Sequence, residues 1–172
     1  VGYATLQGLD ERDIELLKAN DDVQWVAQDV AVQWIDNVEI QGTVSGAEAG
    51  TEAHGHPADA FFYNTYQQDY EHNGTRQMWD AGFTSHPGTL VGIIDTGINP
   101  THQDLAGRVN TGLGKSFVTA PLTPGDLDPH TDEHFHGTFV AGTVTSNQFG
   151  NAGISRFGTV VALKALRISG SG

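Results

Sequence analysis

The hydrophobic pattern in the second half of the chain is typical of strands that alternate with helices. Residues 90–94 (LVGII) form a short continuous apolar run that ends at Asp-Thr-Gly, as expected of a parallel strand buried on both faces. Residues 114–118 and 160–166 are two further candidate strands. Residues 136–144 (HGTFVAGTV) have the small side chains of a helix packed closely on a sheet. This order predicts an open α/β sheet.

The start of the chain has the pattern of a small α+β unit. Residues 1–6 alternate weakly, as a strand would, and residues 11–20 place apolar side chains on one helical face after Asp10, a candidate N-cap. Residues 23–32 (VQWVAQDVAV) are rich in β-branched and aromatic residues and predict a second strand. A unit of this size is too small to be a stable domain alone.

Between these two regions the chain loses its periodicity, from residue 36 to about residue 68. Residues 42–59 (GTVSGAEAGTEAHGHPAD) are small, acidic and polar, which predicts a flexible, protease-accessible linker. Order is expected to return at residues 78–83 (MWDAGF). The sequence therefore predicts three parts, at residues 1–36, 37–78 and 79–172.

Composition and charge narrow the function classes. The 172 residues hold 8 Lys and Arg against 21 Asp and Glu, a net charge of −13, which argues against a nucleic-acid partner. The 22 glycines favour tight turns over an all-helical fold. No apolar run approaches the ~18 residues of a membrane span, so no membrane partner is expected. With no cysteine there is neither a disulfide framework nor a thiol nucleophile. Since Met78 is the only methionine, we expect the natural start to lie upstream.

Two residues suit acid–base chemistry. Asp95 ends the buried apolar run, where a carboxylate stays ionised only with a hydrogen-bond or charge partner such as an imidazolium; the alternative is a turn-capping Asp. His136 begins the small-residue helix; the alternative is an ordinary solvated His. Together they would make two thirds of a nucleophilic triad, in which the Asp orients the His and the His takes a proton from a Ser.

These motifs resemble a known family. Residues 91–105 (VGIIDTGINPTHQDL) look like the Asp block of the subtilisin-like serine proteases, the subtilases, and HGTFVAGTV looks like their His block in the same order. Residues 158–172 (GTVVALKALRISGSG) are similar to the strand and glycine-rich turn that follow. Residues 1–36 resemble the second half of the inhibitory propeptide that precedes such catalytic domains.

The resemblance implies a mostly parallel sheet flanked by helices, preceded by a partial α+β prodomain. It makes Asp95 the orienting acid and His136 the general base of a secreted serine endopeptidase, with protein or peptide substrates and its own propeptide as an intramolecular inhibitor. No cofactor is required for that reaction. Maturation cleavage would fall between residues 36 and 62.

Two further sites are suggested more weakly. Asp104 matches the position of a calcium-binding carboxylate in many family members, although the loop that supplies the other ligands is shortened here; the alternative is a turn-capping Asp. Asn73 begins an Asn-Gly-Thr sequon, which matters only if the protein is secreted by a eukaryote.

The chain departs from the family pattern at four places. Phe135 directly precedes His136 where the family usually has Gly, His134 stands where Asn is common, and Arg156 stands where Pro is frequent. Residues 121–131 lengthen the connection between the Asp and His blocks and predict a surface loop. The bulky residue beside the base either alters the approach to the cleft or reflects divergence alone.

The blocks that would hold the oxyanion Asn and the nucleophilic Ser have no counterpart in residues 1–172. The four serines of the last part lie outside such a block and are not candidate nucleophiles: Ser146, Ser155, Ser169 and Ser171. We therefore expect a truncated zymogen, inactive as it stands, whose full-length form carries the Ser beyond Gly172.

Three alternatives stay open. An aspartic protease would explain Asp-Thr-Gly but needs a second such motif or a homodimer, and it leaves HGTFVAGT unexplained. A zinc site could use His130, His134 and His136. A non-enzyme, either an inactive pseudoenzyme or a propeptide-type inhibitor module at residues 1–36, would explain the missing Ser.

Overall fold

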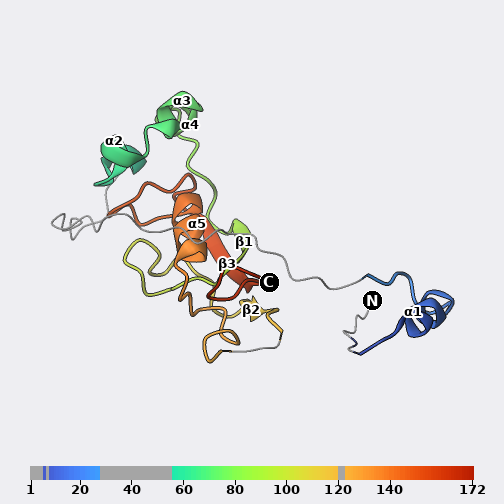
Figure 1. Cartoon of the computed structure of the whole chain (residues 1–172). Helices are drawn as coiled ribbons and strands as arrows, with labels where there is room; N and C mark the ends of the chain where they lie inside the picture. The colour runs from blue at the N-terminus through green and yellow to red at the C-terminus, as the bar shows by residue number, and fades with distance from the viewer. Residues whose placement is uncertain (1–5, 7, 28–55, 120–122) are drawn as a thin grey trace. The chain divides into compact units, whose positions relative to one another are not determined.

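The computed structural model describes residues 6, 8–27, 56–119 and 123–172 (Figure 1). The chain divides into two compact units, residues 1–31 and residues 32–172. The sheet, the helix that follows the Asp-Thr-Gly block and both candidate catalytic residues belong to the second unit.

The first unit holds helix α1, Glu11–Lys18, which begins where the sequence predicts. Asp10 caps it: the Asp13 backbone N–H donates to the Asp10 carboxylate at 2.9 Å, and the Asp10 N–H donates to the Asp13 carboxylate at 3.1 Å. The strand prediction at residues 23–32 is wrong for residues 23–27, which are irregular, and Trp25 is 76% exposed. A strand needs a partner for its backbone groups, and the described part of this unit offers none. Residues 28–32, and all but Leu6 of the predicted first strand, lie outside the described residues.

In the second unit, the described strands form one parallel sheet in the order β1-β3-β2. Strand β1 is Leu90–Asp95, β2 is Lys115–Ser116 and β3 is Thr159–Lys164. The register between β1 and β3 runs from Leu90 opposite Thr159 to Asp95 opposite Lys164. The sequence predictions for β1 and β3 are confirmed. Strand β2 is shorter than predicted because it pairs with the last two residues of β3 and the chain then turns away.

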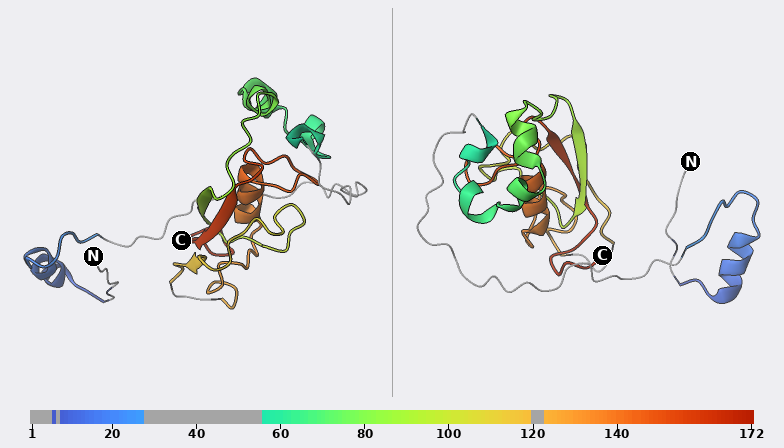
Figure 2. Two further views of the ribbon diagram at one scale, coloured as in Figure 1. Left: turned by 180° about the vertical axis from the view of Figure 1, so that it is seen from behind. Right: turned by 90° about the horizontal axis from the view of Figure 1, so that it is seen from above.

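Helix α5, His136–Val144, lies against one face of this sheet, as Figure 2 shows. Its buried residues are Gly137, Ala141 and Gly142, the small side chains that predicted close packing. The core between helix and sheet is apolar and consists of Ile93, Ile98, Leu105, Ala141, Val160 and Ala162. The predicted α/β class, a parallel sheet flanked by helices, is confirmed.

A chain of short helices occupies residues 57–80, where the sequence analysis expected a linker as far as residue 68. These are a 3-10 turn η1 and three α-helices: η1 Pro57–Asp59, α2 Tyr63–Tyr66, α3 Asp69–His72 and α4 Thr75–Asp80. Each is too short to show a 3.6-residue period, which is why the pattern gave no signal. Their order comes from a second apolar cluster of Ala58, Ala60, Tyr63, Tyr70, Trp79 and Ala152.

Side-chain hydrogen bonds join these helices to the loop after α5. The Gln67 amide bridges the backbone of Ala152, since its N–H donates to the carbonyl and its oxygen accepts from the N–H, both at 2.8 Å. The Trp79 indole N–H donates to the Ile154 carbonyl at 3.0 Å. Residues 57–80 are therefore ordered within the second unit.

Tyr70 makes this cluster sensitive to alkaline pH. Its side chain packs edge-on against Trp79, and desolvation by burial raises the pKa of its phenol to about 12, from an ordinary 10.0. Above about pH 10 the unfolded chain loses this proton before the folded chain does, so the free energy of unfolding falls as pH rises toward 12. At high pH the wild type should lose on the order of 2 kcal/mol in its free energy of unfolding, measured with urea. Tyr70→Phe keeps the ring without the ionisable hydroxyl, so we expect it to show no such loss. An equal alkaline loss in wild type and variant would contradict this assignment.

Candidate active site

Asp95 is the last residue of β1, at the carboxyl end of the sheet. Its backbone carbonyl accepts hydrogen bonds from the N–H groups of Ala165 and Leu166, at 2.9 and 3.1 Å. Its carboxylate accepts from the Thr96 N–H at 2.7 Å, and the residue is 7% exposed. Strand pairing and the turn after β3 thus fix the position of the carboxylate.

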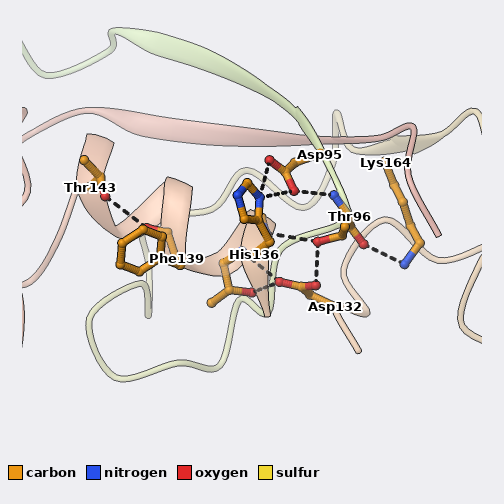
Figure 3. A network of polar contacts seen from close by, with 9 residues as sticks. Asp95, Thr96, Asp132, His136, Phe139, Thr143 and Lys164 are labelled. Carbon is orange, nitrogen blue, oxygen red and sulfur yellow. Dashed lines mark hydrogen bonds and ion pairs between the residues drawn. The ribbon is translucent and has the colours of Figure 1, made fainter. Parts of the chain in front are cut away.

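His136 is the first residue of α5, and its ring faces Asp95. Nδ1 lies 2.9 Å from both carboxylate oxygens (Figure 3). The carboxylate accepts a proton from nitrogen, so this contact assigns the hydrogen to Nδ1 and leaves Nε2 as the free base. The His136 side chain is 34% exposed and that of Asp95 is 10% exposed. The pair combines a buried carboxylate with an imidazole open to solvent.

Two glycines allow the helix to start this close to the strand end. A Cβ atom on Gly137 would lie 2.1 Å from the Gly97 carbonyl oxygen, and Gly97 has φ +115°, a conformation that L side chains rarely adopt. Thr96 bridges the same gap: its hydroxyl accepts from the Gly137 N–H at 3.0 Å and donates to Asp132 at 2.8 Å. Backbone contact therefore sets the distance between the acid and the base.

Sequence reasoning missed Asp132, whose carboxylate is central to this arrangement. It accepts hydrogen bonds from the hydroxyls of Thr96 and Thr138 and from the Thr138 N–H, at 2.6 to 2.8 Å. The available signal was an Asp shortly before a helix, where a carboxylate satisfies free N–H groups. Asp132 holds the first turn of α5 against the turn that follows β1.

Phe135, one of the departures from the family pattern, has a left-handed backbone with φ +68°. Glycine adopts this conformation without steric cost, which explains in physical terms why the family usually has Gly there. The Phe135 ring is 46% exposed and stacks on His134, with ring centroids 5.2 Å apart. The aromatic side chain lies outside the apolar core, and the strain stays in the backbone.

This strain predicts an unusual order of stability at residue 135. Phe135→Val should lower the free energy of unfolding by about 1–2 kcal/mol, because a β-branched residue is poorly tolerated at positive φ. Phe135→Gly should stay within about 1 kcal/mol of wild type, since relief of strain offsets the greater freedom of the unfolded chain. Urea unfolding of both variants measures the difference. A valine variant as stable as the glycine variant would show that the backbone is not left-handed there.

The predicted calcium ligand Asp104 is buried and already saturated with donors. Its carboxylate accepts from the N–H groups of Phe149, Gly150 and Asn151 and from the Ser146 hydroxyl, at 2.7 to 3.1 Å. Four donors aimed at one carboxylate do not fit a calcium ion. They match the alternative in which Asp104 caps a loop.

The other suggested sites are placed as follows. Asn73 is exposed after α3, and its side-chain oxygen accepts from the Thr75 N–H and hydroxyl; its glycosylation stays a prediction. Of the three histidines of the zinc hypothesis, His134 and His136 have ring centroids 6.2 Å apart. Nδ1 of His130 instead lies 3.5 Å from the Asp128 carboxylate. Within the described ranges, no group of three or more His, Cys, Asp or Glu side chains is arranged to hold a metal ion.

Three of the four serines near the end of the chain have hydrogen-bond partners other than Asp95 and His136, whereas the Ser155 hydroxyl is buried without one among the described residues. The buried Ser146 hydroxyl lies 2.7 Å from both the Asp104 carboxylate and the Asn151 carbonyl, which share its one hydrogen. Ser169 and Ser171 contact each other at 2.6 Å. None of the helices that the structure describes has the length and apolar character needed to span a bilayer.

Asp95 at the carboxyl end of the parallel sheet thus pairs with His136 at the start of α5, and comparison with known proteins assigns the family. Residues 86–172 match the profile of the subtilase family, and the chain belongs to this family. The subtilase-type proteinase psp3 of Schizosaccharomyces pombe is 39% identical over 98 residues, 57% of this chain and 19% of psp3.

Two bacterial proteins are also similar. M-protease of Shouchella clausii is 33% identical over 176 residues, which cover 98% of this chain and 40% of that protein. The minor extracellular protease Vpr of Bacillus subtilis is 36% identical over 102 residues, 58% of this chain and 12% of Vpr. The chain thus spans less than half the length of each of these relatives.

Proposed function

We propose that this chain is part of a subtilisin-like serine endopeptidase in which Asp95 and His136 are two members of an Asp-His-Ser triad. The observation that carries the proposal is the 2.9 Å contact of Nδ1 with a buried carboxylate, which leaves Nε2 of the partly exposed His136 ring as the free base. The named relatives psp3, M-protease and Vpr, all described as proteases or proteinases, support the reaction class.

In this reaction His136 takes the proton of a serine hydroxyl through Nε2 while the hydroxyl oxygen attacks the peptide carbonyl. Asp95 holds the ring by its Nδ1–H and stabilises the imidazolium that forms. His136 then gives the proton to the leaving amine. In the second half of the reaction, His136 takes a proton from a water molecule that attacks the acyl-enzyme carbonyl. His136 returns this proton to the serine oxygen as the acid product leaves. The serine and the oxyanion-stabilising Asn would come from sequence beyond Gly172, so residues 1–172 alone should be inactive.

The same proposal includes a zymogen. Residues 1–36 would be the end of an inhibitory propeptide, with maturation cleavage between residues 36 and 62, protein or peptide substrates and an extracellular location. The likeness of residues 1–36 to such propeptides and the extracellular designation of the relative Vpr support this part.

The test uses the full-length gene product beside His136→Ala. N-terminal processing is followed by intact mass, and a fluorophosphonate probe reports an activated serine. We expect the wild type to cleave itself between residues 36 and 62 and to take the label, and the variant to do neither. A wild type that takes no label would reject the endopeptidase and favour the pseudoenzyme or the propeptide-type inhibitor.

A further inference from the structure

Lys164 is a fully buried lysine at the end of β3, beside the Asp–His pair. Its side chain is directed toward the turn after β1 (Figure 3), and the residue is 1% exposed. Its amino group donates to the carbonyl oxygens of Thr96 and Thr131, both at 2.7 Å. Lysine is almost never fully buried unless its donors are satisfied, because burial of an unpaired charge is costly. The two carbonyls therefore account for its position.

These two carbonyls belong to the segments that carry the acid and the base. Thr96 directly follows Asp95, and Thr131 directly precedes Asp132, which caps the helix that begins at His136. The acid and the base are 41 positions apart in sequence. The Lys164 amino group thus joins the two segments through their backbone carbonyls. Among the described residues, no hydrogen bond links it to the side chain of Asp95 or His136.

We propose that Lys164 is a positioning residue for the triad. It fixes the distance between the Asp95 and His136 segments through the Thr96 and Thr131 carbonyls. This inference rests on the proposed function, because its consequence is catalytic.

The experiment compares the full-length protease with Lys164→Met, which keeps the length of the side chain but removes its donors and charge. Lys115→Met is the matched control, because Lys115 is an exposed lysine on the neighbouring strand β2. For Lys164→Met we expect kcat on a peptide substrate to fall by roughly 10- to 100-fold with little change in KM. The control should match the wild type in both kcat and KM.

A purely structural role would lower the melting temperature and the yield but leave kcat of the folded protein unchanged, and that result would overturn the inference. If Lys164→Met does not fold, Lys164→Gln takes its place under the same criteria, because its side chain is one bond shorter and cannot hold both carbonyls at the 2.7 Å of the wild type. If the wild type itself is inactive, the proposed function fails. The inference is then judged by the downfield proton NMR signal of the His136 Nδ1–H: loss of the signal in the variant supports positioning, and retention overturns it.

Discussion

Asp95→Asn in the full-length protease is expected to lower kcat by about 10⁴-fold while the fold stays intact. The Asp95 carboxylate can only accept hydrogen bonds, and it receives them from the Thr96 N–H and from Nδ1 of His136. An asparagine amide of the same shape can instead donate to Nδ1. The hydrogen then moves to Nε2, and His136 loses the lone pair that would accept the serine proton. The measurement is kcat for a peptide substrate, together with circular dichroism to confirm the fold.

The combination with His136→Ala sharpens this test. Triad members act as a unit, so the double variant should be no slower than His136→Ala alone. Asp69→Asn is the matched control, since Asp69 is an exposed carboxylate in the first turn of α3 and should retain wild-type kcat. Independent, multiplying losses in the double variant would contradict the contact between acid and base. An unchanged kcat in Asp95→Asn would remove Asp95 from the mechanism.

The parts of the fold that could be predicted from sequence are those whose signal is local. The apolar run before Asp95 predicts a buried strand, because a parallel strand covered on both faces needs apolar side chains throughout. The small residues after His136 predict a helix that packs closely on the sheet. The pairing of Asp95 with His136 across 41 positions was accessible through the resemblance of two motifs to a family. From periodicity alone, Asp95 also fitted a turn-capping Asp, and His136 fitted an ordinary solvated His.

The parts that escaped prediction depend on contacts distant in sequence. Tyr63 and Tyr70 lie in helices too short to show a period, and they are ordered by a cluster that includes Trp79 and Ala152. The sequence gives no hint that Lys164 is buried, since its two carbonyl partners are defined only by the folded backbone. The conformation of Phe135 was likewise hidden, although its departure from a family glycine marked the position.

The largest effect on stability is expected at Gly137. A Cβ atom there would lie 2.1 Å from the Gly97 carbonyl oxygen and 3.2 Å from the Cβ of Asp95, and rigid backbone cannot move aside as a flexible side chain can. Gly137→Ala must therefore push the first turn of α5 away from the end of β1. We expect it to lower the free energy of unfolding by about 3 kcal/mol. Because the displaced turn carries His136, kcat should also fall by about 100-fold.

Gly142→Ala in the same helix separates this close approach from the general effect of adding a methyl group. A Cβ on Gly142 would meet just one atom within 4 Å, the Asn151 side-chain nitrogen at 3.8 Å, which is ordinary contact. Alanine is favoured over glycine in a helix interior, so this variant should gain about 0.5–1 kcal/mol. Urea unfolding of the two variants should therefore give changes of opposite sign. If Gly137→Ala were as well tolerated as Gly142→Ala, α5 could not begin in contact with the Gly97 carbonyl, and the short distance between Asp95 and His136 would lose its structural cause.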